Sequence, residues 1–142
     1  MKAGFVQFFP KFGNVHTNLN RVEGLLYGKV ADLVVLPELF STGYRFRNME
    51  EAHHYAELVP GGITTKFLCS LAKKMDACFI AGLVEIDNER IYNSSIVVGP
   101  EGFIGRYRKI HLFDTEKDCF HSGKEPPPVF DLKGAKVGVM IC

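Results

Sequence analysis

Three β-rich segments follow one another between residues 78 and 110, and they constrain the fold more than any other part of the chain. The segments are CFIAGLVEI at 78–86, RIYNSSIVVG at 90–99 and FIGRYRKI at 103–110. The connectors DNE and PEG between them are turn-like, so the three segments predict an antiparallel meander. Such a meander places a β-sheet at the centre of the expected fold.

Two segments have the periodicity of amphipathic helices. Apolar residues recur at steps of three and four in residues 14–30 and again in residues 64–75. Asn14 is the expected N-cap of the first helix, and Thr64 or Thr65 is the expected N-cap of the second. We therefore expect each helix to bury one apolar face.

Shorter segments complete the expected order. The run DLVVLPEL at 32–39 is apolar on both faces, which is typical of a strand inside a layered sheet. The remaining expected elements are strands at 3–8 and 136–142, a short helix at 49–57 and irregular chain at 111–128. This order predicts an α/β fold with α+β character, in which residues 1–142 belong to one domain and helices cover the outer face of a large sheet.

Charge and hydropathy exclude several classes of function. The chain is 46% hydrophobic and 23% charged, which is ordinary for a globular domain. Its formal net charge is +1, so we expect no nucleic-acid partner. No apolar run approaches the roughly 18 residues that a membrane span requires, so we expect no membrane partner either.

The cysteines and histidines do not predict a metal site. The four cysteines show no CxxC spacing, which argues against zinc and against a thioredoxin-type pair. His53 and His54 are adjacent, so on a helix their side chains would point apart. No secretion signal is evident at the start of the sequence, and reduced thiols in a cytoplasmic protein are therefore the expectation.

Three reactive side chains lie where predicted strands end. Glu38 follows LVVLP, Lys109 follows FIGRYR, and Cys142 follows KVGVMI. Strand ends are where layered α/β proteins place their sites, because the sheet holds the backbone rigid there. Taken singly, each residue has an ordinary alternative: a solvated carboxylate, a surface lysine, or a small buried cysteine.

Taken together, the motifs are more specific. The segments LVVLPELFSTGY, GRYRKIHLF and GVMIC occur in this order, with YNSSIVVGPEGF before the lysine motif. The whole chain resembles the nitrilase superfamily of carbon–nitrogen hydrolases. The resemblance implies a four-layer α-β-β-α sandwich, incomplete in this chain, and a Glu-Lys-Cys triad. It also implies hydrolysis of an amide, a carbamoyl group or a nitrile of a small molecule without a metal or organic cofactor, by a homodimer or larger homo-oligomer.

The resemblance assigns roles by position. Glu38 matches the general base, Lys109 the lysine, and Cys142 the nucleophile. Glu116 matches a second glutamate that many members carry after the lysine motif. His111 lies in the RKxHL pattern as a supporting residue of the site wall.

The segment after Glu38 is expected to contact substrate. It contains Tyr44, Arg45 and Phe46, which we expect at the entrance of the pocket. A carboxylate-bearing amide would suit Arg45, although an exposed loop arginine is the more common case.

These side chains suit the chemistry. A thiol is a weak nucleophile until it loses its proton, and a carboxylate held beside it can accept that proton. The ammonium of Lys109 would stabilise the oxyanion that forms when Cys142 attacks a carbonyl. Glu38 would then protonate the leaving amine, and water would hydrolyse the thioester on Cys142.

The chain is shorter than members of the superfamily, which continue beyond the nucleophile. We therefore expect residues 1–142 alone to lack full activity and to expose an apolar sheet face. The alternatives are a nitrilase proper, an ammonia-supplying amidase domain, or an inactive fragment that acts only by association. A redox thiol protein is a weaker alternative, because no resolving cysteine accompanies Cys142.

Overall fold

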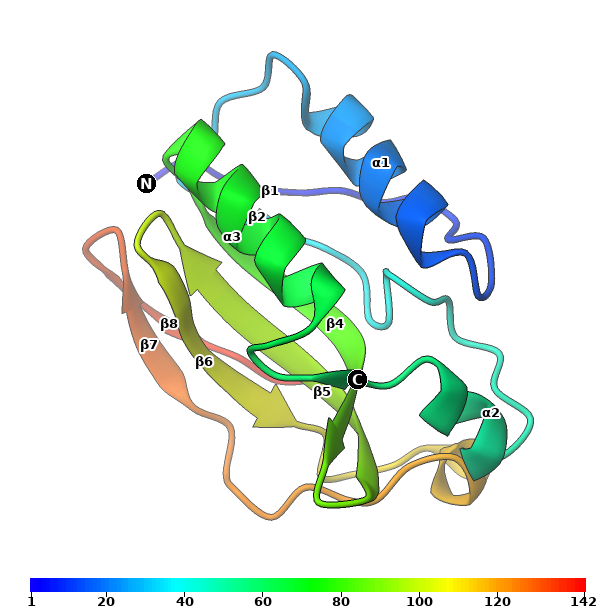
Figure 1. Cartoon of the computed structure of the whole chain (residues 1–142). Helices are drawn as coiled ribbons and strands as arrows, with labels where there is room; N and C mark the ends of the chain where they lie inside the picture. Colours follow the sequence, from blue (N-terminus) through cyan, green and yellow to red (C-terminus); the bar gives the residue numbers. More distant parts are fainter.

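The computed structural model describes every residue from Met1 to Cys142 and has a mixed α/β fold, as predicted (Figure 1). None of its helices combines the length and the apolar character that crossing a membrane would require. The elements are, in order, β1 (Ala3–Phe5), α1 (Val15–Leu26), β2 (Leu33–Val35), α2 (Met49–His54), β3 (Glu57–Leu58), α3 (Ile63–Met75), β4 (Cys78–Asp87), β5 (Arg90–Gly99), β6 (Gly102–Arg108), the 3-10 helix η1 (Asp114–Asp118), β7 (Val129–Leu132) and β8 (Ala135–Gly138).

The main sheet has six strands, five of them in the order β1-β2-β4-β5-β6, with β3 pairing with β4. Strands β1, β2 and β4 run parallel to one another, whereas β4, β5 and β6 form the predicted antiparallel meander. The β4–β5 turn places Asn88 and Glu89 at positive φ, the backbone that a tight two-residue hairpin requires. The prediction of a large sheet is therefore confirmed.

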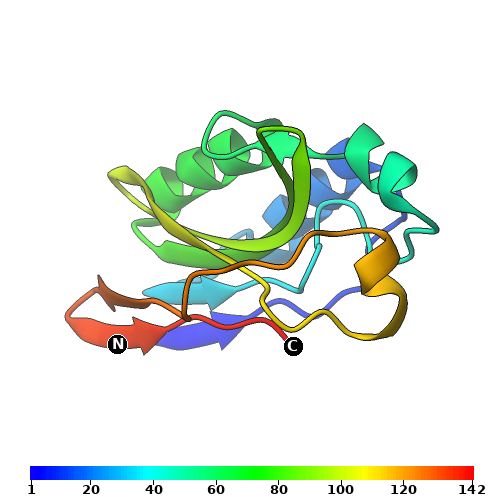
Figure 2. The ribbon, with the colours of Figure 1, turned by 90° about the horizontal axis from the view of Figure 1, so that it is seen from below.

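Helices α1 and α3 cover one face of this sheet (Figure 2). The main core lies between them and the strands, and its fully buried members include Val22, Leu68 and Phe79. The other face carries the β7–β8 hairpin, whose Leu132 packs with Val97 and Tyr107 in a second core. Side chains alternate between the two faces along each strand, so neighbouring residues of β5 and β6 enter different environments.

The hairpin leaves part of that second face open. Phe5 of β1 is 74% exposed, and its partner Val35 of β2 is 39% exposed. Val35 lies on the face opposite the helices, because its neighbour Val34 in β2 belongs to the main core, and Phe5 shares that face as the partner of Val35.

The helix boundaries differ from the prediction in two places. α1 ends at Leu26 instead of continuing to residue 30, and Gly28 then takes a positive φ that leaves the helix. The N-cap of α3 is Gly62, not Thr64 or Thr65, and its side chain can make no capping bond. The carboxylate of Glu57 replaces that cap by accepting a hydrogen bond from the Thr64 N–H at 2.7 Å.

The prediction of a strand over 136–142 was wrong in its extent. Strand β8 ends at Gly138, and its only partner is β7, which the sequence pattern did not reveal. Val139 still donates to the Pro128 carbonyl at 3.0 Å. Prolines 126–128 lack the N–H groups that would continue the ladder, so residues 139–142 leave the strand.

Candidate active site

The backbone of Lys109 is held from two sides immediately after β6. Its N–H donates to the Asn93 carbonyl of β5 at 2.9 Å, and its carbonyl accepts from the Gly123 N–H at 2.8 Å. A Cβ on Gly123 would collide with the Arg108 carbonyl, so only glycine allows the loop this close. The side chain of Lys109 is 1% exposed, and burial of an ammonium requires partners of opposite charge.

Glu38 lies on a turn that is hydrogen-bonded to β4. The Leu36 N–H donates to Ile80 at 2.8 Å, and the Phe40 N–H donates to Gly82 at 3.1 Å. Between these bonds Leu39 takes a φ of 51°, which is uncommon outside glycine. A Cβ on Gly82 would lie 2.5 Å from the Leu39 nitrogen and 2.7 Å from the Glu38 Cα. The turn therefore depends on the missing side chain of Gly82.

Glu116 reaches the same place from η1. Its Oε2 accepts a hydrogen bond from the Phe113 N–H at 2.7 Å, which ties the carboxylate to the start of its own turn. The side chain is 6% exposed. The sequence pattern predicts irregular chain at 111–128, but the structure forms a 3-10 turn there that directs Glu116 inward.

These three side chains meet, and Asn93 joins them. The Lys109 ammonium donates to Glu38 Oε1 at 2.8 Å and to Glu116 Oε1 at 3.0 Å, with Glu116 Oε2 at 2.8 Å. The Asn93 amide donates to the same two Oε1 atoms, at 2.6 Å for Glu38 and 3.1 Å for Glu116. Two donors and two acceptors thus alternate in a closed ring, which we call the carboxylate ring.

The electrostatics of the ring follow from burial and pairing. Burial lowers the pKa of Lys109, but the hydrogen bonds to Glu116 and Glu38 outweigh burial and hold that pKa well above its usual value. Burial raises the pKa of Glu116, but the Lys109 and Phe113 hydrogen bonds outweigh it and the pKa is lowered. Lys109 is therefore an ammonium, and Glu116 a carboxylate, at neutral pH.

The residues expected to contact substrate lie beside the ring. A hollow of about 260 Å³ is lined by Tyr44, Arg45, Phe46 and Glu116, among others. Burial, and then the carboxylates of Glu116 and Glu38, raise the pKa of the Tyr44 hydroxyl. Arg45 makes no ion pair.

Phe46 and His111 have less direct positions. Phe46 packs edge-on against Phe12 and Phe120, so part of its ring supports the loop. His111 is exposed and makes no side-chain hydrogen bond, so its supporting role stays a prediction.

Cys142 is the one predicted catalytic residue that the structure does not join to the others. It is exposed and lies four residues beyond β8, with no hydrogen bond to the carboxylate ring. Figure 2 shows the end of the chain on the hairpin side of the sheet, opposite the helices. Lys109 enters the same face, because its strand neighbour Tyr107 belongs to the core beneath the hairpin.

A second charged cluster occupies the opposite face of the same strands. Glu85 is fully buried and accepts hydrogen bonds from Ser94 at 2.6 Å and from Arg108 at 2.5 and 3.1 Å. Arg106 pairs with it at 2.8 Å. Asp87 pairs with Arg108 at 2.6 Å, and the Arg108 guanidinium stacks over Tyr92 at 4.1 Å. We call this group the arginine cluster.

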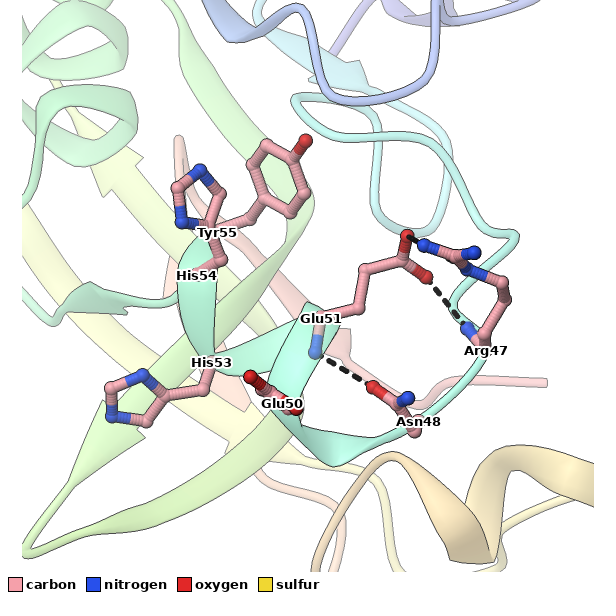
Figure 3. A pocket seen from close by; sticks show the side chains of 7 residues that line it. All are labelled: Arg47, Asn48, Glu50, Glu51, His53, His54 and Tyr55. Atoms are coloured by element: carbon pink, nitrogen blue, oxygen red, sulfur yellow. Dashed lines mark hydrogen bonds and ion pairs between the residues drawn. The ribbon is translucent and has the colours of Figure 1, made fainter.

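Another hollow, of about 550 Å³, lies on α2 and the turn before it, and no residue of the carboxylate ring lines it (Figure 3). Its polar wall contains the Arg47–Glu51 ion pair at 3.0 Å. Figure 3 shows the rings of His53 and His54 in different directions, as expected for neighbours on a helix. No group of three or more His, Cys, Asp or Glu side chains is arranged to hold a metal ion.

Comparison with known proteins identifies the family. A model of the family described as carbon–nitrogen hydrolase matches residues 2–142. The chain belongs to the carbon–nitrogen hydrolase family. It is 46% identical to a nitrilase of Pyrococcus abyssi over 100% of this chain and 55% of that protein. It is 38% identical to the omega-amidase NIT2 of Homo sapiens over 79% of this chain and 43% of that protein.

A solved structure supports the same family. Nit3 of Saccharomyces cerevisiae, a member of branch 10 of the nitrilase superfamily, superposes with a TM-score of 0.85 at 29% identity, covering 100% of this chain and 55% of that chain. This carbon–nitrogen hydrolase chain thus spans about half the length of the curated relatives it matches.

Asn93 lies in the motif YNSSIVVGPEGF, and no role for it was predicted from the sequence. Its signal is a polar residue in the middle of an otherwise buried strand, since the side chain of Asn93 is 0% exposed. A buried amide needs hydrogen-bond partners, so such a residue in the carbon–nitrogen hydrolase sequence predicts a polar neighbour across the sheet. That neighbour is Glu38, which lies 55 positions away in the sequence. The local pattern around Asn93 could not identify it.

Proposed function

We propose that the protein carrying this chain hydrolyses a carbon–nitrogen bond in an amide or carbamoyl group of a small molecule. Cys142 is the nucleophile, Glu38 the general base and acid, Lys109 the oxyanion-stabilising cation, and Glu116 the partner that orients Lys109. The observation that carries the proposal is a buried ammonium held between two carboxylates, one of which is 27% exposed on its side chain. Buried charges arranged in this way are more common at functional sites than elsewhere.

The reaction follows from these groups. Glu38 accepts the proton of the Cys142 thiol, and the thiolate attacks the carbonyl carbon to form a tetrahedral oxyanion. The Lys109 ammonium stabilises the negative charge on that oxygen. The carbon–nitrogen bond then breaks as Glu38 gives its proton to the leaving nitrogen, which departs as ammonia or an amine and leaves a thioester on Cys142.

Water completes the cycle. Glu38 removes a proton from a water molecule, and the resulting hydroxide attacks the thioester carbonyl. Collapse of this second tetrahedral intermediate breaks the carbon–sulfur bond, and the proton on Glu38 returns to the sulfur. The carboxylic acid leaves, and both Cys142 and Glu38 are restored. Tyr44, Arg45 and Phe46 contact the substrate, and a carboxylate on the substrate would suit the unpaired Arg45.

A nitrile substrate, or ammonia supply to a synthetase, is the alternative within the same chemistry. The relatives include a nitrilase and an omega-amidase, so each choice has a relative in its favour. We also expect a homodimer or larger assembly in the cytoplasm. Light scattering of the purified protein tests the expected assembly.

Ammonia release from a panel of amides, carbamoyl amino acids and nitriles tests the proposal. The expected result is turnover by the wild-type protein, its loss in Cys142→Ala, and a covalent acyl adduct on Cys142 in the intact mass. Lys109→Met should lower kcat by about 10²- to 10³-fold, because an oxyanion donor is lost.

Cys69→Ala is the matched control, since Cys69 is a half-buried thiol on α3 outside the ring. Turnover that survives in Cys142→Ala contradicts the proposed nucleophile. A correctly folded wild type that acts on no member of the panel favours a role by association only.

A further inference from the structure

Asn93 occupies an unusual place for an amide side chain. It lies near the middle of β5, opposite Val84 of β4, and has no exposed surface. Its main-chain carbonyl also accepts the Lys109 N–H at 2.9 Å. One residue therefore holds both the backbone of Lys109 and, through its side chain, the two carboxylates that Lys109 binds.

The orientation of this amide is set by charge. Its Nδ2 lies 2.6 Å from Glu38 Oε1 and 3.1 Å from Glu116 Oε1, and an amide oxygen in that place would face two carboxylate oxygens. The other end of the amide makes no hydrogen bond, because the Asn93 Oδ1 is buried without a partner. Leaving a buried carbonyl oxygen unpaired is unfavourable, so the Nδ2 contacts dominate the placement of this side chain.

The ring leaves one carboxylate oxygen free. Both Oε1 atoms accept from Lys109 and Asn93, and Glu116 Oε2 accepts from Phe113 and lies beside the ammonium. Glu38 Oε2 accepts no hydrogen bond. Because the Glu38 side chain is also the most exposed member of the ring, this oxygen is the one that a thiol or water can reach.

We propose that Asn93 is a positioning residue that occupies Oε1 of Glu38 and thereby makes Oε2 the oxygen that accepts and returns the proton. The inference rests on the proposed function and adds a residue to it. The second N–H of the same amide ties Glu116 to Glu38, so that one ammonium can hold two carboxylates close together. Asn93 acts through Glu38 and does not contact the substrate.

The test is the pH dependence of kcat/KM in Asn93→Leu, Asn93→Asp and the control Ser95→Ala. Ser95 lies two residues along β5 on the same face and makes none of the hydrogen bonds of the ring. The charged or titratable groups that face Glu38 are Lys109 after β6, Glu116 of η1 and Tyr44 of the loop after β2. All of them are unchanged in these variants.

We expect kcat/KM of Asn93→Leu to fall about 10- to 100-fold with little change in KM, the range that corresponds to losing a hydrogen bond to a charged group. The acid limb of this variant, meaning the fall of kcat/KM at low pH, should move to higher pH. The reason is that the ionised carboxylate loses a hydrogen-bond donor. Asn93→Asp should lose more activity at neutral pH, since it adds a third carboxylate, and should recover part of it in acid, where the protonated group donates again. Ser95→Ala should match the wild type.

The outcomes separate the two proposals. A wild type that turns over, with an unchanged acid limb in the folded Asn93 variants, overturns the positioning role and leaves the proposed function intact. Should Asn93→Leu fail to fold, the isosteric Asn93→Asp decides by its acid limb. A folded wild type with no ammonia release contradicts the proposed function and removes the basis of this inference with it.

Discussion

The two charged clusters of this protein use neighbouring residues of the same strands and differ in how completely they are paired. Asn93 and Lys109 enter the carboxylate ring on one face, whereas Ser94 and Arg108 enter the arginine cluster on the other. In the arginine cluster, both oxygens of Glu85 accept two bonds each. In the carboxylate ring, one oxygen of Glu38 accepts none.

The arginine cluster is also more completely balanced in charge than the carboxylate ring. Two arginines face Glu85 and Asp87, so the arginine cluster can be neutral. One ammonium faces Glu38 and Glu116, so with both ionised the ring keeps an excess negative charge. A saturated, balanced cluster is suited to holding strands together, whereas an unsaturated one retains a group that can take a proton. The comparison separates a structural network from a candidate reaction centre.

The largest expected effect comes from comparing the same substitution in Glu38 and in Glu85. Glu38→Gln should lower kcat by about 10²- to 10⁴-fold, because the amide cannot accept the thiol proton. Its stability should change little, since Lys109 keeps Glu116 as a partner. Glu85→Gln should instead lower the free energy of unfolding by about 1.5–3 kcal/mol, because a neutral amide replaces the buried carboxylate that pairs with Arg106 and Arg108. Urea denaturation and ammonia release, measured on both variants, check the two halves.

Equal losses of activity per folded molecule in the two variants would contradict the division into a structural arginine cluster and a reactive carboxylate ring. So would a Glu38→Gln protein that is as destabilised as Glu85→Gln.

A smaller effect should follow from disturbing the backbone beneath Glu38. Gly82→Ala places a Cβ 2.5 Å from the Leu39 nitrogen, so the turn must move. We expect kcat to fall by about 10²-fold, the cost of a displacement near 1 Å in a reacting group. Overpacking should also cost about 1–3 kcal/mol of stability.

Gly4→Ala is the control for that substitution, because no atom lies within 4 Å of a Cβ there. It should leave kcat unchanged. A Gly82→Ala variant with wild-type kcat would mean that the turn tolerates the shift and that Glu38 is not held as described.

The smallest expected effect concerns the pH dependence of stability. The pKa of Glu116 is lowered in the folded protein, so its contribution is present above the usual carboxyl pKa and is lost as the pH falls through the folded value. The pKa of Lys109 is raised, so its contribution is present below its usual pKa and is lost only as the pH rises through the folded value. The pair therefore stabilises the fold across the neutral range.

Glu116→Gln should consequently flatten the loss of thermal stability between pH 6 and pH 3. Asp87→Asn in the arginine cluster should flatten it less, because Asp87 is more exposed, although Arg108 lowers its pKa in the same direction. Thermal unfolding of the three proteins at stepwise pH measures the slopes. An unchanged slope in Glu116→Gln would contradict the pairing of Glu116 with Lys109.

Much of the site could be predicted because it depends on local pattern. Glu38 and Lys109 follow apolar strands that end at a proline and at an irregular segment, and the structure places both at those ends. Their meeting in space was implied only by the resemblance to the family, not by any local pattern. Cys142 is different, because the predicted strand before it depended on a partner that the pattern did not reveal. Only the β7–β8 pairing, and the prolines that limit it, show where that strand ends.

The sequence by itself determined the strand meander, the two long helices and the residue types at the strand ends, because side-chain periodicity records which face of an element is buried. The tertiary structure alone decided that Asn93 closes the carboxylate ring and that Glu38 Oε2 is free. It also decided that Arg108, adjacent to Lys109, enters the arginine cluster on the opposite face. The physical reason is that hydrogen-bond saturation depends on atoms from β5, β6, η1 and the turn after β2, which are distant in sequence and meet only once the sheet has formed.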